Sequence, residues 1–347
     1  RDGGFAGNEP ANYDLSQRDF TAHASILDGQ HNQRLLPQNN DFTTRTIWDG
    51  FTLQNGNAHQ YGGVYNSNRN YGGGAYLRLG VILRNCVITG NSAESYGGGV
   101  YQTYNSYNTY DTTFLINCTV SHNTASQYGG GAYFNRYVVA DGCSFEYNSN
   151  TYDGGGVYMS SNVLLDNCLV ANNTTNNGRG AGIYTTNSSS SIRNSTIVNN
   201  EMTGSSNDKG AGIYAYYSTI QNCIVWGNKK DGEPSGIEGD NYVASYIASD
   251  VSFTGTDRIG LSTVNEGYGA LSPQFVNPST TEGASDVTAN VDWHLQQGSP
   301  CINRGDNSVA GTYDLDGNAR VQMDVIDLGC YESPYQGVEM PNFNGIV

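Results

Sequence analysis

Apolar and polar residues alternate along this chain in short runs, and one pattern recurs six times between Leu83 and Asn228. Each copy begins with an apolar residue, followed three positions later by a small residue, two positions later by a second apolar residue, and three positions later by Asn. Amphipathic helices place apolar residues every 3.6 positions, whereas strands alternate. The pattern therefore predicts short strands separated by turns.

The six copies align into four columns, and a glycine phrase that ends in Tyr precedes each copy. The apolar leads are Leu83, Leu115, Ala140, Leu165, Ile192 and Ile220. The small residues are Cys86, Cys118, Cys143, Cys168, Ser195 and Cys223. The second apolar residues are Ile88, Val120, Phe145, Val170, Ile197 and Val225. The closing residues are Asn91, Asn123, Asn148, Asn173, Asn200 and Asn228.

The column of small residues advances by 32, 25, 25, 27 and 28 positions, a period typical of solenoid proteins. The copies are rich in Gly, Asn, Ser, Thr and Tyr, which argues against helical repeats. Strands this short cannot bury one side alone, but parallel stacking at roughly 4.8 Å per coil pairs the backbone groups and builds a continuous core. The sequence therefore predicts an all-β fold, a parallel β-helix.

Two features of the pattern predict the corners of the coils. The three-residue and two-residue steps cannot lie on one face of a straight strand, so a bend must fall between them. We expect these bends near Asn85, Asn117, Asn167, Asn194 and Asn222. Asn tolerates left-handed backbone, and its amide can bond to its counterpart in the next coil. The glycine runs suit tight corners where a Cβ atom would clash.

Composition agrees with a solenoid and excludes some partners. The 347 residues include 45 Gly and 26 Tyr, and a narrow solenoid core can be built from 37% hydrophobic residues. The formal charge is −16, with no cluster of Lys or Arg, which argues against nucleic acid or an anionic membrane surface as a partner. No apolar run approaches the roughly 18 residues of a membrane span. We expect any targeting segment to lie upstream of Arg1 or to have been removed.

Several phrases resemble a known family. Gly-Gly-Gly-Ala-Tyr at 72–76, Asn-Cys-Thr-Val-Ser-His-Asn at 117–123 and Phe-Glu-Tyr-Asn at 145–148 resemble the repeats of chlamydial polymorphic outer membrane proteins and of related Bacteroidetes β-helix proteins. Ser-Pro-Cys-Ile-Asn at 299–303, Asp-Leu-Asp-Gly-Asn at 314–318 and Asp-Leu-Gly-Cys-Tyr-Glu at 327–332 resemble their closing module, often called a choice-of-anchor domain. The resemblance implies a right-handed single-stranded parallel β-helix of the pectate-lyase type with a small C-terminal cap. It also implies a secreted or outer-membrane-associated bacterial surface protein, often an adhesin, and supplies no activity.

The cysteines fall into two groups. Where the resembled family usually has Ala, this chain has Cys301 and Cys330, and this paired departure suggests a disulfide in an oxidising compartment. The five cysteines of the repeat column are interpreted as reduced core residues, because parallel side chains on adjacent strands rarely reach the disulfide torsion. Zinc is the alternative, but a single-file column offers no tetrahedral arrangement.

The register also divides the chain. We expect a β-helix over 1–292, with irregular first coils over 1–60, regular coils over 61–230 and irregular late coils over 231–292. A closing module follows over 293–334, and a tail or linker over 335–347. Insertions at 102–114 and 201–209 lengthen two coils, and such insertions often form binding loops.

Catalytic and metal-binding interpretations each have a plainer alternative. Asp141 and Asp166 lie one coil apart, which would suit a glycosidase pair or half a calcium site, but Arg193 in the next coil favours an ion-paired row. Asp314, Asp316 and Asn318 have calcium-loop spacing, yet the twelfth position is Val325, which favours a turn held by Asx hydrogen bonds. Arg304-Gly305-Asp306 is interpreted as structural, and the five His residues form no ligand pair. We expect no metal and no cofactor.

The tyrosines that end the glycine phrases are the candidate binding residues. Alternation should turn Tyr76, Tyr101, Tyr133, Tyr158, Tyr184 and Tyr214 outward as an exposed ladder, and Tyr104, Tyr107 and Tyr110 lie in the first insertion. A stabilising ladder is the plainer interpretation; an extended glycan or a surface protein would be the partner of a binding one. The function is thus a non-catalytic adhesin or binding module, with a polysaccharide lyase or glycoside hydrolase as the alternative. We favour the first because basic residues are sparse along the coils.

Overall fold

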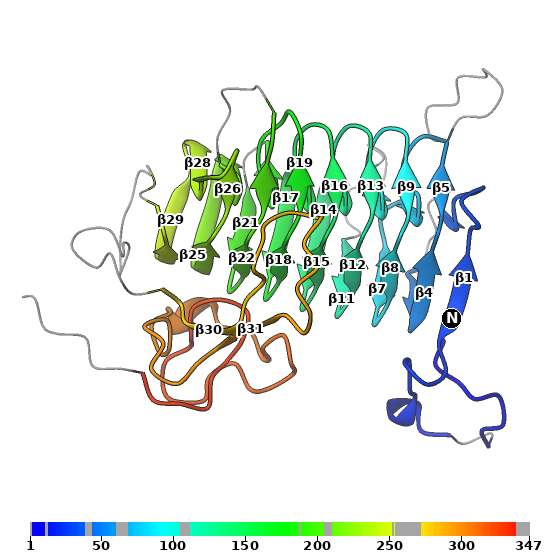
Figure 1. Ribbon diagram of the computed structural model, residues 1–347. Coiled ribbons are helices and arrows are strands. Elements are labelled where there is room, and N and C mark those ends of the chain that lie inside the picture. Colours follow the sequence, from blue (N-terminus) through cyan, green and yellow to red (C-terminus); the bar gives the residue numbers. More distant parts are fainter. Residues whose placement is uncertain are drawn as a thin grey trace, which may run out of the picture.

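The computed structural model describes residues 2–10, 13–38, 44–59, 69–104, 112–186, 189–204, 210–251, 253 and 272–337. These residues form a solenoid of parallel strands, with a small module lying against its side (Figure 1). Two single-turn 3₁₀ helices, η1 (Leu15–Gln17) and η2 (Asn307–Val309), are the helices of the described chain. None of them is long and apolar enough to cross a membrane. The predicted all-β parallel solenoid is confirmed.

Each coil passes through four strand positions, and long strands join two of them across a bend. The lead position holds β3 (Thr46–Asp49), β7 (Val81–Arg84), β11 (Thr113–Ile116), the second half of β14 (Ala132–Asp141) and of β17 (Val157–Asp166), β21 (Ser190–Arg193), the start of β25 (Ser218–Trp226) and the start of β29 (Val243–Ser249). The next position holds β1 (Ser25–Asp28), β4 (Phe51–Gln54), β8 (Val87–Thr89), β12 (Thr119–Ser121), β15 (Ser144–Glu146), β18 (Leu169–Ala171), β22 (Thr196–Val198) and the end of β25.

The other two positions complete the coil. Short third strands form a separate sheet from β5 (Asn57–Ala58), β9 (Ser92–Ala93), β13 (Thr124–Ala125), β16 (Ser149–Asn150), β19 (Thr174–Thr175), β23 (Glu201–Met202), β26 (Lys229–Lys230) and the antiparallel β27 (Glu233–Pro234). The glycine phrases lead into β2 (Leu36–Pro37), β6 (Ala75–Leu77), β10 (Val100–Gln102), the starts of β14 and β17, β20 (Ile183–Thr185), β24 (Ile213–Tyr216) and β28 (Ile237–Asp240).

The predicted columns stack in register. Leu115 pairs with Leu83 on one side and Ala140 on the other, and Val120 likewise pairs with Ile88 and Phe145. Every lead, small and second apolar residue of the six copies is buried, and one continuous apolar core runs through them. The inward column of small residues, from Cys86 onward, is confirmed, with every repeat thiol free.

Two different Asn columns hold the coils in place. The predicted bend residues Asn85, Asn117, Asn167, Asn194 and Asn222 all have left-handed backbone, with φ between 49° and 55°. The closing asparagines instead form a fully buried amide ladder. Asn123 Nδ2 donates to Asn148 Oδ1 at 3.0 Å and to the Ile88 carbonyl at 2.9 Å, and Asn148 repeats the pattern toward Asn173. From Asn123 onward, each ladder oxygen also accepts the backbone N–H of the preceding Asn, at 2.9–3.0 Å.

The glycine phrases mark a corner where the coils approach each other closely. A Cβ atom on Gly98 would lie 2.4 Å from the carbonyl oxygen of Gly130 in the next coil. Gly97 before it has a φ of +63°, a backbone conformation that would be strained for any residue with a side chain. Glycine meets both conditions in the first four phrases, whereas the last two keep glycine at the left-handed position, Gly180 and Gly210, and have Ala181 and Ala211 at the second.

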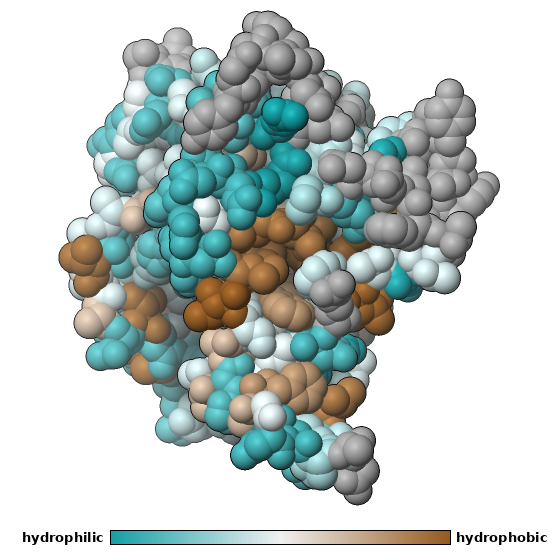
Figure 2. Space-filling model, turned by 90° about the vertical axis from the view of Figure 1, so that its right-hand side faces the viewer, coloured by the Kyte–Doolittle hydropathy of each residue, from teal (hydrophilic) through white to brown (hydrophobic). Residues whose placement is uncertain are grey.

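The first coil leaves part of the core open at one end of the solenoid. Leu27, Leu35, Trp48 and Phe51 pack on the core but are only partly buried. Figure 2 looks onto this end and shows apolar side chains gathered at its centre. The chain before β1 is tied down beside it, where Arg18 and Arg84 both bind the buried Asp49 carboxylate at 2.7 Å. Among the described residues, the strands β1 and β3 at this end each pair with a strand on one side only.

The closing module lies along the side of the late coils rather than across the end (Figure 1). Its strands β30 (Phe275–Asn277) and β31 (Asp292–Leu295) pair antiparallel, and both enter one apolar cluster with Leu169, Val198 and Ile224. These solenoid residues lie on the outer face of β18, β22 and β25. The segment from 272 onward thus packs with the module, although we expected late coils as far as 292.

The Asn ladder generates a stability prediction. Asn148→Asp should lower the free energy of unfolding by roughly 3 kcal/mol or more at pH 7, because a buried carboxylate oxygen would then face the Val120 carbonyl and Asn173 Oδ1 in place of a donor. Chemical denaturation of the intact chain measures it. The control is Asn117→Asp, at an exposed bend position where Asp also tolerates left-handed backbone. Equal losses in the two variants would contradict the ladder's importance.

Candidate functional site

The six predicted tyrosines form a continuous stack along one side of the solenoid. Tyr76, Tyr101, Tyr133, Tyr158, Tyr184 and Tyr214 pair in register across successive coils. Neighbouring ring centroids in this column lie 4.4–5.5 Å apart. The rings point away from the core, as alternation predicted, since none belongs to the core cluster.

The prediction that this ladder is exposed is wrong. Tyr76, Tyr101 and Tyr184 are buried and the other three are half-buried. A second tyrosine row, made of Tyr71, Tyr96, Tyr128 and Tyr152, packs against the first. Because rings cover rings, burial raises the pKa of the phenols of Tyr76, Tyr101, Tyr133, Tyr158 and Tyr184, that of Tyr184 to about 12. The inner faces are therefore not free to stack on a ligand.

Sequence reasoning missed the outer row, although a signal was present. A tyrosine stands immediately before the glycine phrase at Tyr71, Tyr96 and Tyr128, and one residue earlier at Tyr152. In the following coil Arg179 takes this place and lies over the rings of Tyr184 and Tyr214, at 4.9 and 4.8 Å. At the other end Arg34 lies 4.9 Å over Tyr76, and burial lowers its pKa to about 10. Cations thus close both ends of the aromatic stack.

The first insertion is only partly described. Tyr104 is half-buried, and the Arg136 guanidinium lies 5.2 Å from its ring. Tyr107 and Tyr110 lie outside the described residues, as does 205–209 of the second insertion. Their part in a contact surface stays a prediction.

One of the two carboxylates of the acidic row is ion-paired, as the plainer interpretation expected for the row. Asp141, Asp166 and Arg193 are register partners in successive coils. Arg193 binds Asp166 at 2.7 Å, and Asn194 Nδ2 donates to the same carboxylate at 2.8 Å. Asp141 stays exposed, yet partial desolvation and the neighbouring Asp166 raise its pKa, opposed by Arg193. The two carboxylates therefore have different environments.

The candidate calcium loop is a structural turn. Asp314 is buried, and its Oδ1 accepts the backbone N–H groups of Asp316 and Asn318. Its Oδ2 accepts hydrogen bonds from the side-chain amide of Asn318 and from the backbone N–H of Glu332. This is the Asx-type arrangement that the sequence favoured. Over the described ranges no group of three or more His, Cys, Asp or Glu side chains is placed to hold a metal ion.

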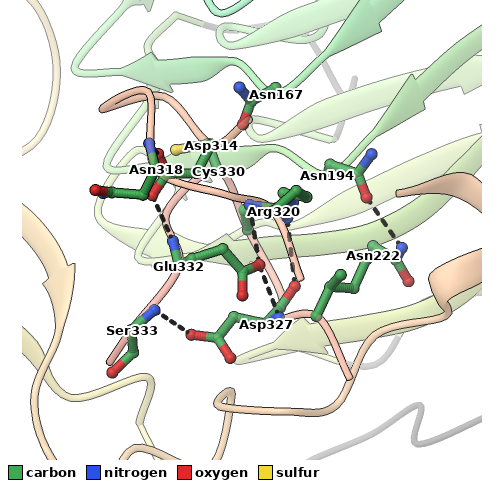
Figure 3. Close-up of polar contacts among 12 residues, drawn as sticks. Asn167, Asn194, Asn222, Asp314, Asn318, Arg320, Asp327, Cys330, Glu332 and Ser333 are labelled. Atoms are coloured by element: carbon green, nitrogen blue, oxygen red, sulfur yellow. Dashed lines mark hydrogen bonds and ion pairs between the residues drawn. The ribbon is translucent and has the colours of Figure 1, made fainter. Parts of the chain in front are cut away.

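A buried polar network lies behind this turn (Figure 3). Arg320 Nη1 lies 3.4 Å from Glu332 Oε1, which also accepts the Asp327 N–H at 2.9 Å. Asp327 in turn accepts the Ser333 N–H at 2.7 Å. Burial raises the pKa of Asp327 to about 6 and of Glu332 to about 8, and the charge of the Arg320 guanidinium opposes both shifts. The motifs that resembled a closing module thus build its interior.

The bend asparagines of the late coils hold this module on the solenoid. Asn167, Asn194 and Asn222 donate their amides to the carbonyls of Tyr313, Val309 and Asp306, at 3.1, 2.8 and 3.0 Å. Figure 3 shows them beside the module's network. Asp306 also accepts Gln221 Nε2 at 2.9 Å, so this residue of the Arg304-Gly305-Asp306 tripeptide takes part in docking.

The expected Cys301–Cys330 disulfide is wrong. Both thiols are free and buried in the module's apolar cluster. Each thiol lies beside a different hydroxyl, Ser299 for Cys301 and Thr196 for Cys330, and burial raises the pKa of both to about 12. They are packing residues, and this evidence for an oxidising compartment disappears.

A cleft of about 550 Å³ opens where the module meets the middle coils. The solenoid contributes Ile116, Asn117, Asp141 and Asn167, and the module contributes 312–317. Asp316 lines it too and binds His294 Nε2 at 2.7 Å, while Asp292 binds Nδ1 at 2.6 Å. Asp141 of the acidic row and Asp316 of the candidate calcium loop are far apart in the chain, yet both line this cleft.

The model of a protein family described as "right handed beta helix region" matches residues 40–217 and 110–247, more than half of the chain. The chain belongs to the right-handed β-helix family. No curated protein matches it. Members of this fold include surface and binding proteins as well as pectate-lyase-like enzymes, so membership leaves the activity open. The finer resemblance to polymorphic outer membrane protein repeats and to a choice-of-anchor module stays a prediction.

The buried network predicts a pH dependence. The folded-state pKa of Glu332, about 8, lies above its ordinary value, so the native state keeps a proton that the unfolded chain has released between those two values. Its contribution to stability is thus largest in acid and is lost as pH rises toward 8. Glu332→Gln, which stays neutral, should be relatively more stable at pH 8.5 than at pH 5.5, as thermal unfolding would show. A pH-independent difference between the two proteins would contradict the assignment.

Proposed function

We propose that this β-helix protein is a non-catalytic, secreted or cell-surface binding protein of a bacterium, associated with the outer membrane, that contacts an extended glycan or a surface protein. The observation that carries the proposal is the outer tyrosine row, which runs along several coils on one side. Tyrosine is rigid and amphipathic, so it supplies contact area at low entropic cost. The resemblance to adhesin-like surface proteins supports the same class.

The exposure of the row determines how it would bind. Tyr152 is 45% exposed, whereas Tyr71, Tyr96 and Tyr128 are half-buried. A ligand would meet partly exposed tyrosines repeated at the coil spacing, which suits a long, repetitive partner held by many weak contacts. The net charge of −16 and the lack of a basic cluster argue that charge attraction is not the main term.

The aromatic row can be tested with a matched pair of exposed tyrosines. Tyr152→Asn should weaken binding to glycans found on a glycan array, or to a captured surface protein, by about three- to tenfold, in keeping with one aromatic contact. Tyr217→Asn is the control, because Tyr217 is 46% exposed but outside the stack. Affinity should change little between low and moderate salt. Equal affinities of the two variants would count against the row.

The lyase or hydrolase alternative rests on the cleft, where Asp141 and Asp316 come together. Asp166 is neutralised by Arg193, so it is a poor partner for Asp141 in acid–base work. The enzyme hypothesis therefore predicts that Asp141→Asn abolishes turnover of a neutral or acidic polysaccharide, while Glu146→Gln on the adjoining strand does not. Release of reducing ends or unsaturated products measures it. Turnover lost in this way would replace the non-catalytic proposal.

A further inference from the structure

A second concave surface lies where the module meets the late coils, and tryptophan dominates it. This pocket, of about 540 Å³, is lined by Trp226 from the end of β25 and by Phe275 and Trp293 from the module's two strands. The whole chain has three tryptophans, and two of them are here. Its volume falls within the range of small-molecule sites, which often form between structural units.

The aromatic residues differ in what they can offer. Trp293 is 4% exposed and packs edge-on against Phe275, at 5.0 Å and 89°, so this pair forms a fixed wall. Trp226 is only partly buried against the same cluster. It projects from the solenoid at the bend before β26, where earlier coils carry the polar Ser121 and Glu146 at the matching position. Its ring therefore combines support from behind with an accessible surface.

The polar groups of the pocket are amides and one neutralised ion pair. Asn199 Nδ2 donates to Ser279 at 2.9–3.1 Å, and Gln296 Nε2 donates to the Phe275 carbonyl at 2.8 Å, which fixes both amides. The Gln274 amide has no hydrogen-bond partner among the described residues. Lys229 is the one cation among the lining residues, and Glu282 binds it at 2.5 Å. No free positive charge in the lining would attract an anion.

We propose that this tryptophan pocket binds a sugar ring of a neutral glycan. A sugar has an apolar C–H face that can pack on Trp226, and its hydroxyls can bond to amides such as Gln274. The pairing of Lys229, together with the net charge, disfavours acidic sugars. The inference rests on the proposed glycan-binding function and names a site separate from the tyrosine rows.

The test titrates the intact chain with three neutral hexasaccharides, of β-linked glucose, xylose and mannose, and with an oligogalacturonate. Isothermal titration and tryptophan fluorescence are read together. We expect at least one neutral hexasaccharide to bind with a change in fluorescence, and Trp226→Leu to weaken it at least about tenfold, as for a central aromatic contact. Gln274→Ala should weaken it too, and it provides a test should Trp226→Leu fail to fold. Trp48→Leu, the matched removal of the remaining tryptophan, should leave affinity and the fluorescence change in place.

The outcomes separate this inference from the function it rests on. Binding that survives Trp226→Leu and Gln274→Ala but weakens in Tyr152→Asn would overturn the pocket and leave the glycan-binding function standing. Binding of the oligogalacturonate alone would overturn the preference for neutral sugars and hence the inference. No binding of any of the four sugars at millimolar concentration would also overturn it, whereas a surface protein captured through Tyr152 would still support the proposed function.

Discussion

The buried amide ladder is the interaction on which the rest of this structure depends. The closing asparagines from Asn91 to Asn200 each donate to the Asn of the next coil and to a carbonyl of the preceding coil, so a coil cannot slide along its neighbours without leaving buried polar groups unpaired. The apolar columns alone would not fix this alignment, because Leu, Val and Ile make non-directional contacts and can pack against one another in place of their own counterparts. The directional amides define the register, and through it the stacking of the tyrosines and of the acidic row.

The closing module joins the solenoid along one side of the late coils, and two of the concave surfaces of the described structure lie where they meet. The outer face of the coils changes from polar to apolar along the axis, since Ser144 and Glu146 of β15 are followed by Leu169 and Ala171 of β18. The module covers that apolar stretch and is held by the bend asparagines beside it. Both the acidic cleft and the tryptophan pocket lie along this seam. The candidate sites of this protein therefore lie at this seam as well as along the tyrosine rows.

The tyrosine rows illustrate how one residue can serve structure and contact together. The rings of the inner row stack on one another, and Arg34 and Arg179 pack on rings at its two ends. Tyr152 of the outer row is the most exposed tyrosine of the two rows. Substitutions in the inner row would therefore disturb the packing of the solenoid, which makes them poor probes of the proposed binding.

The sequence alone determined the repeating part of this protein, because neighbouring coils repeat the same local chemistry. The strand periodicity, the inward columns and the left-handed bends at Asn85 through Asn222 all follow from residues that meet their own counterparts one coil away. Tertiary structure decided what has no repeat. The outer tyrosine row buries the inner one, Cys301 and Cys330 pack beside different hydroxyls, and the module folds back along the late coils. These outcomes depend on contacts between segments as distant as Asn167 and Tyr313, whose meeting no local pattern encodes.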